Sequence, residues 1–97
     1  MRQILIEKYI EPSESINRDD GRFTEFWVNQ NGDLHNFMGH PSEIRYYNGK
    51  IGSQAWHKKG IQHRERGLPA EICYNLNGQI AYKGWFKNGE FIKKETF

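Results

Sequence analysis

The stretch that decides the fold is GIQHRERGLPAEICYNLNG, residues 60–78 of a 97-residue chain. An earlier stretch, GDLHNFMGHPSEIRYYNG at residues 32–49, repeats its pattern. In both, a His, a Gly, a Pro, a Glu and a Tyr follow the first Gly at equal distances, and an Asn-Gly pair closes the stretch. Agreement at so many positions indicates an internal duplication with a period of 28 or 29 residues.

Tryptophan marks the same period along the chain, because Trp27, Trp56 and Trp85 are each 29 residues apart. The other recurring positions are His35 and His63, Gly39 and Gly67, Pro41 and Pro69, Glu43 and Glu71, and Tyr46 and Tyr74. A residue that recurs in every unit of a duplicated structure is usually one that the fold requires in every unit. We therefore interpret this whole set as structural.

The turn residues indicate the type of secondary structure. Asn-Gly pairs at residues 31–32, 48–49, 77–78 and 88–89 separate segments that alternate apolar and polar side chains, such as PAEICYNL at residues 69–76. Asn-Gly is typical of type I′ hairpin turns, in which both central residues have positive φ. The sequence predicts an all-β fold, an antiparallel meander of about eight or nine strands made of hairpin repeats. It allows at most one short helix, near residues 12–20.

We expect one domain over residues 1–97. It would comprise an N-terminal strand and loop (1–16), the first repeats (17–49), a second repeat (50–78) and a truncated third repeat (79–97). Hydrophobic residues make up only 36% of the chain, but three Trp, five Tyr and six Phe supply large side chains. This composition favours a thin structure held by aromatic stripes.

The best-preserved unit carries Trp56, Gly60, His63, Arg64, Gly67, Pro69, Ala70 and Glu71. This arrangement resembles the tandem NG-x-x-HR-x-x-GPA repeats of many small phage and bacterial proteins, which are often grouped with MORN-type repeats. The resemblance covers about residues 17–92, and the first unit departs from it at Asn36, His40 and Ser42. It implies a β-hairpin meander and carries no agreed activity.

Neither a metal site nor an active site is indicated. Four histidines and the single cysteine, Cys73, lack the paired short spacings of structural zinc ligands. No nucleophile motif, phosphate-binding loop or dinucleotide fingerprint occurs, so a small metal-dependent or His-based enzyme is the least favoured class. We expect no cofactor. We interpret His35 and His63 as residues that hydrogen-bond neighbouring backbone groups after a tight turn.

The cysteine content and the apolar segments of the sequence indicate the cellular location we expect. One cysteine cannot form an intramolecular disulfide, which favours the cytoplasm, or the host cytoplasm if a phage encodes the chain. The N-terminal apolar run is too short for a signal peptide, and no run reaches the length of a membrane span. We therefore expect no membrane partner.

Differences between the units indicate where a partner would bind. Asn36, Phe37 and Met38 stand where the second unit has Arg64, Glu65 and Arg66. The alternative is that Phe37 and Met38 pack onto residues 1–10. A second difference is HKKG at residues 57–60, where the first unit has VNQNG. It adds His57, Lys58 and Lys59, which with Arg64, Arg66, Lys83 and Lys87 would form a basic patch. The candidate partner-binding residues are thus Asn36, Phe37, Met38, His57, Lys58, Lys59, Arg64 and Arg66.

The charge distribution favours an acidic partner, because residues 1–48 carry a net charge of −3 and residues 49–97 one of +5. We predict a non-catalytic protein-binding module, an inhibitor that blocks a host defence factor, enzyme or toxin. The terminal segments MRQILIEKYI and EFIKKETF are natural pairing edges, also for a homodimer. The alternative is a nucleic-acid-binding protein that uses its basic half, since basic residues neutralise phosphates and aromatic side chains stack on bases.

Overall fold

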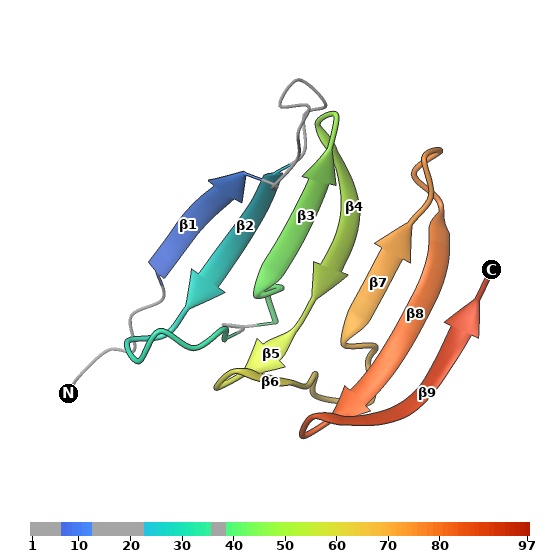
Figure 1. Ribbon diagram of the computed structural model, residues 1–97. Helices are drawn as coiled ribbons and strands as arrows, with labels where there is room; N and C mark the ends of the chain where they lie inside the picture. The colour runs from blue at the N-terminus through green and yellow to red at the C-terminus, as the bar shows by residue number, and fades with distance from the viewer. Residues whose placement is uncertain (1–6, 13–22, 36–38) are drawn as a thin grey trace.

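The computed structural model describes residues 7–12, 23–35 and 39–97, and it confirms the predicted all-β antiparallel meander (Figure 1). Seven strands form one sheet in the order β1-β2-β3-β4-β7-β8-β9, and β5 and β6 form a separate small hairpin. The strands are β1 (Glu7–Pro12), β2 (Phe23–Val28), β3 (Glu43–Tyr47), β4 (Lys50–Ala55), β5 (His57–Lys58), β6 (Ile61–Gln62), β7 (Glu71–Tyr74), β8 (Ile80–Lys87) and β9 (Glu90–Thr96). The described residues contain no helix; of the segment where one was allowed, residue 12 ends β1 and residues 13–20 lie outside the described part.

Strand pairing repeats across the sheet with the period of the sequence. One continuous row of partners is Phe26, Glu43, Ala55, Glu71, Gly84 and Lys94. The register of β3 on β4 shifts at a bulge between Arg45 and Tyr46, and that of β7 on β8 shifts between Cys73 and Tyr74, 28 residues later. Bulges bend strands and increase their twist, so each unit curves the sheet at the same place.

The sheet is a single layer with a thin core. The buried hydrophobic residues among those described are Val28, Ile44, Trp56 and Ala70, and the buried polar ones are Thr24, Asn29, Ser42 and His63. The molecule measures 44 × 29 × 18 Å. Its accessible surface is 6996 Å², whereas a compact monomer of this mass exposes about 5,800 Å². Much of the chain is therefore exposed, including eight large hydrophobic side chains among the described residues.

Among the described residues three hairpins have the type I′ conformation, two of them at predicted Asn-Gly pairs. Both central residues have positive φ at Asn48-Gly49 (51° and 77°), at Lys59-Gly60 (53° and 83°) and at Asn88-Gly89 (52° and 85°). Asn tolerates this left-handed region better than most residues because its short polar side chain bonds locally. The prediction of hairpin turns is confirmed here, and Lys59 adopts the same conformation without that advantage.

The type I′ prediction is wrong at Asn31-Gly32 and Asn77-Gly78, where only the glycine has positive φ. These are longer turns organised by an earlier asparagine. The Oδ1 atom of Asn75 accepts hydrogen bonds from the backbone N–H groups of Asn77 and Gln79, at 2.9 and 3.1 Å. Asn29 accepts the same two bonds in the first unit, also at 2.9 and 3.1 Å. An asparagine side chain that imitates a turn is a common alternative to type I′ geometry.

Candidate functional site

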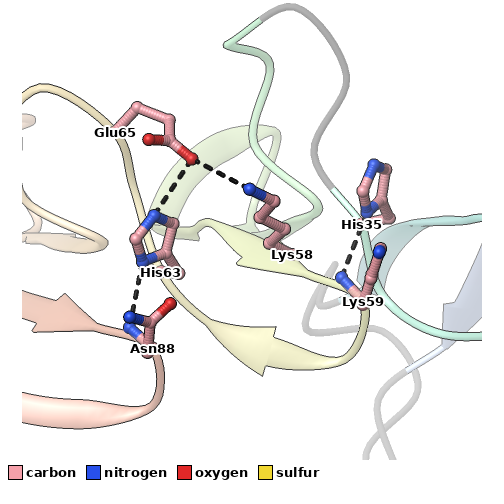
Figure 2. Close-up of polar contacts among 6 residues, drawn as sticks. All are labelled: His35, Lys58, Lys59, His63, Glu65 and Asn88. Atoms are coloured by element: carbon pink, nitrogen blue, oxygen red, sulfur yellow. Dashed lines mark hydrogen bonds and ion pairs between the residues drawn. The ribbon is translucent and has the colours of Figure 1, made fainter.

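The recurring histidines join consecutive units of the repeat (Figure 2). His35 Nδ1 accepts a hydrogen bond of 3.1 Å from the backbone N–H of Lys59, and His63 Nδ1 accepts one of 2.9 Å from that of Asn88. Each donor is the first residue of the next unit's type I′ turn. The ring of His63 also lies 3.0 Å from the Glu65 carboxylate through its Nε2 atom. Because Nδ1 accepts, the ring proton belongs on Nε2, where it is donated to Glu65.

The recurring tryptophans and glycines make a second contact between units. Trp56 Nε1 donates to the carbonyl of Gly39 at 2.8 Å, and Trp85 Nε1 donates to that of Gly67 at 2.9 Å. Both glycines have positive φ, 81° and 68°. A loop that must turn its carbonyl toward the next tryptophan in this conformation favours glycine. Trp27 contacts the ring of His40 edge-on, at 4.4 Å between centroids.

The remaining recurring residues lie around β3 and β7. Pro41 and Pro69 stand two residues before these strands, whose first residues are Glu43 and Glu71. Proline has no N–H for the ladder and suits the approach to a strand.

The tyrosines of these two strands bond to equivalent neighbours. Tyr46 donates to the Glu25 carboxylate at 2.7 Å, and Tyr74 donates to the Gln54 side chain at 2.8 Å. Burial and the bond to Glu25 raise the pKa of Tyr46 to about 12. The phenol therefore stays protonated and remains the donor of this bond.

Five of the eight predicted partner-binding residues lie in the described part of the chain, in different surroundings. Asn36, Phe37 and Met38 lie outside the described residues. His57 is half-buried, with its Nδ1 atom 2.7 Å from the Ser42 hydroxyl, and burial lowers its pKa. Lys59 occupies a turn.

The other basic residues belong to the loop that follows His63 or contact it. Lys58 is paired with Glu65 at 3.4 Å. The guanidinium of Arg64 lies 3.8 Å from the centre of the Trp56 ring and donates to the carbonyl of Pro69 at 3.0 Å. Arg64 is thus held against the scaffold, whereas the exposed Arg66 faces a cleft.

This cleft has a volume of about 410 Å³. One side is the loop of residues 63–68, and the other consists of residues 85–87 and Ile92. Its lining combines the basic residues Arg64, Arg66 and Lys87 with the apolar residues Leu68, Phe86 and Ile92. Sequence reasoning placed Arg64, Arg66 and Lys87 in a basic patch but missed the three apolar residues, because the Trp85–Gly67 contact that brings Leu68 near β8 and β9 cannot be read from the sequence.

Strand β9 borders the cleft and forms one edge of the sheet (Figure 1). All seven of its residues are exposed, and Phe91 and Ile92 expose 51% and 53% of their surface. Within the described part of the chain, no strand pairs with its outer side. A long exposed edge with apolar side chains is the kind of surface to which another strand adds.

The described residues also bear on metal binding and on membrane insertion. They hold no group of three or more His, Cys, Asp and Glu side chains placed to bind a metal ion. No helix among them is long and apolar enough to cross a bilayer. Cys73 is a free thiol, and burial raises its pKa.

Comparison with known proteins gives no relative from which a site is transferred. The chain matches no family model, no curated protein and no solved structure. The resemblance to phage and bacterial hairpin repeats stays a prediction, and the cleft and the β9 edge are the candidate functional site of this chain.

Proposed function

We propose that the protein is a non-catalytic protein-binding module that blocks a surface of its partner, and that it binds through β9 and the adjoining cleft. The observation that carries the proposal is the exposure of the whole of β9, with Phe91, Ile92 and the following Phe97 exposed together. Large apolar side chains gathered at one edge are typical of interaction surfaces. The basic residues of the cleft suit an acidic partner, and the free thiol of Cys73 suits a reducing compartment.

The pattern of rigid and exposed residues supports a binding role. The histidine and tryptophan bonds fix each unit on the next, so β9 and the cleft are presented by an ordered scaffold. Preorganisation reduces the entropic cost of association. Phe91 at the edge and Arg66 in the cleft are also of types that are enriched at protein interfaces.

Affinity capture from extracts of the source cells tests the proposal, with wild-type protein and two variants. Ile92→Glu places a charge at the centre of the candidate surface, and we expect it to cost about 2 kcal/mol of binding free energy or more. Leu76→Glu is the matched control, because Leu76 is 76% exposed but lies in the turn between β7 and β8. Wild type and the control should capture the same protein, and Ile92→Glu should lose it while melting normally.

The alternative is nucleic-acid binding by the basic half, and mobility-shift assays with unrelated DNA and RNA at physiological salt address it. Tight binding to both with a steep salt dependence would replace our proposal. A captured protein that Ile92→Glu retains would show that binding occurs elsewhere. Sedimentation analysis of the wild-type chain identifies a second copy as the partner if it is one.

A further inference from the structure

We infer that the outer edge of β9 takes up an extended, acidic segment of a partner protein as an additional antiparallel strand, with an acidic residue opposite Lys94. The inference rests on the proposed function and specifies the chemistry of the segment that is bound. Three features carry it: the direction of the backbone groups of β9, the place of β9 in the repeat, and the charge at this edge.

The backbone direction follows from the hydrogen bonds of β8. The carbonyl of Gly84 accepts a hydrogen bond of 2.8 Å from the N–H of Ala70, the residue just before β7. Gly84 therefore directs its backbone N–H and C=O toward β7. Lys94 is the register partner of Gly84 on the other side. In an antiparallel ladder a pair is either bonded through both residues or through neither, so Lys94 directs its N–H and C=O away from β8.

The end of β9 agrees with this alternation. Phe97 N–H donates to the carbonyl of Ala81 at 3.0 Å, so Phe97 faces β8. In a strand, the backbone N–H and C=O groups of residues two positions apart point toward the same neighbouring strand. Those of adjacent residues point toward opposite sides. Lys94 and Thr96 therefore present two N–H and two C=O groups to the free edge. These are the groups that an added strand would bond.

The place of β9 in the repeat shows that this edge is built to accept a strand. Lys94 pairs with Gly84 as Glu71 pairs with Ala55 and as Glu43 pairs with Phe26. At their outer edges Glu43 and Glu71 each pair with a further antiparallel strand, β4 and β8 respectively. The edge at Lys94 thus repeats an environment that takes up a strand twice within this sheet.

The charge at this edge selects an acidic occupant. Lys94 occupies the position in β9 that is equivalent to the glutamates of β3 and β7. Its partner in β8 is a glycine, which has no side chain. Among the described residues no carboxylate lies within 4.0 Å of its ammonium group. Lys93 adjoins it and lies over the Trp85 ring at 4.6 Å. Opposite charges at facing positions of neighbouring strands stabilise their pairing.

The same charges disfavour a second copy as the occupant. Two β9 strands paired symmetrically about Lys93 or Lys94 would place two ammonium groups directly opposite each other, although the register about Lys94 also sets Lys93 of each strand opposite Glu95 of the other. Pairing about Glu95 would place two carboxylates opposite each other. Like charges at facing positions are destabilising. An acidic segment of a different protein avoids all three conflicts.

Peptide binding to the full-length chain tests the inference. The probes are fluorescein-labelled peptides of about ten residues, long enough to pair along one strand, in which Val alternates with Glu, Gln or Lys. Fluorescence anisotropy at low ionic strength should show the Glu peptide binding at least ten-fold more tightly than the Gln peptide, with the Lys peptide weakest. Equal affinities for the three peptides, or no binding of the Glu peptide, would overturn the inference.

Substitutions of Lys94 separate the backbone from the charge. Lys94→Pro removes an N–H that β8 does not use and should abolish binding of the Glu peptide. Lys94→Ala keeps that N–H and should retain part of the affinity, and Lys94→Glu should reverse the preference toward the Lys peptide. Lys50→Glu is the charge control in β4 and should bind as wild type does. Wild-type affinity in Lys94→Pro would contradict strand addition.

NMR spectra of the backbone amides in wild-type protein provide a second test in case Lys94→Pro unfolds. On addition of the Glu peptide to wild-type protein, the amides of Lys94 and Thr96 should shift and become protected from exchange more than those of Lys93 and Glu95. The reverse pattern would rule out the assigned edge. If all peptides fail while Ile92→Glu still loses a captured protein, the proposed function stands and strand addition is wrong.

Discussion

The two recurring histidines show how a single residue type is used twice for one structural purpose. The sequence predicts hydrogen bonds from their rings to neighbouring backbone. His63 accepts its bond from the backbone N–H of Asn88, 25 residues further along the chain. A backbone N–H at the start of a tight turn has no partner in its own hairpin, and the ring nitrogen of the preceding unit supplies one. That the role of these residues is purely structural stays a prediction.

His57 is the residue whose ionisation should matter for stability. Burial lowers its pKa below the ordinary value of 6.5, and the Glu43 carboxylate only partly opposes this. Between the two pKa values the unfolded chain binds more protons than the folded chain. The free energy of unfolding should therefore fall as the pH drops below about 6.5, and the fall should end below the folded-state pKa.

The first unit supplies the matched variant for this prediction, because Val28 follows Trp27 as His57 follows Trp56. His57→Val should lose less of its melting temperature between about pH 7 and pH 5 than wild type does. Thermal melts across this range measure the difference. An identical pH dependence in the two proteins would show that His57 does not titrate as its burial indicates.

At the scale of the element, two kinds of Asn-Gly turn should respond differently to the same substitution. Asn48 has a φ of 51°, so Asn48→Ala should lower the free energy of unfolding by about 1 kcal/mol. Asn77 lacks positive φ, and Asn77→Ala should change it by less than about 0.5 kcal/mol. Asn75→Ala should cost about 1–2 kcal/mol, because its side chain accepts two backbone bonds. Urea denaturation compares them, and equal effects at Asn48 and Asn77 would contradict the assignment.

These turns also show how much of the fold can be predicted from the sequence. The Asn-Gly pairs correctly placed the hairpins, because any tight turn between strands favours residues that accept positive φ. At Asn31-Gly32 and Asn77-Gly78 they did not reveal the turn type, because Asn29 and Asn75 act from outside the pair. The cleft was not predictable for a similar reason. It depends on how the loop after His63 lies against β8, a contact between segments about one period apart.

At the scale of the whole molecule, the repeat explains both the shape and the free edge. Each unit adds strands to one growing sheet, and no second layer covers either face within the described residues. Stability then comes from contacts between neighbouring units, as in other repeat proteins. Strand β9 forms one edge of this sheet and keeps the pairing geometry of β3 and β7. It carries the positive charge of Lys94 at the position where those strands carry a negatively charged glutamate. The sequence indicated the edge, but only the register identified Lys94.

Amide hydrogen exchange should reveal this architecture across the sheet. In β9 and the following Phe97 of the isolated protein, Lys93, Glu95 and Phe97 should exchange slowly because they face β8, whereas Lys94 and Thr96 should exchange rapidly. Strand β7 is the internal control, because it pairs with β4 on one side and β8 on the other. Its residues Ile72 and Cys73 should both be protected, with no alternation. Slow exchange at Lys94 in a monomer would mean that its N–H is already bonded, and an edge occupied in this way has no place for a partner strand.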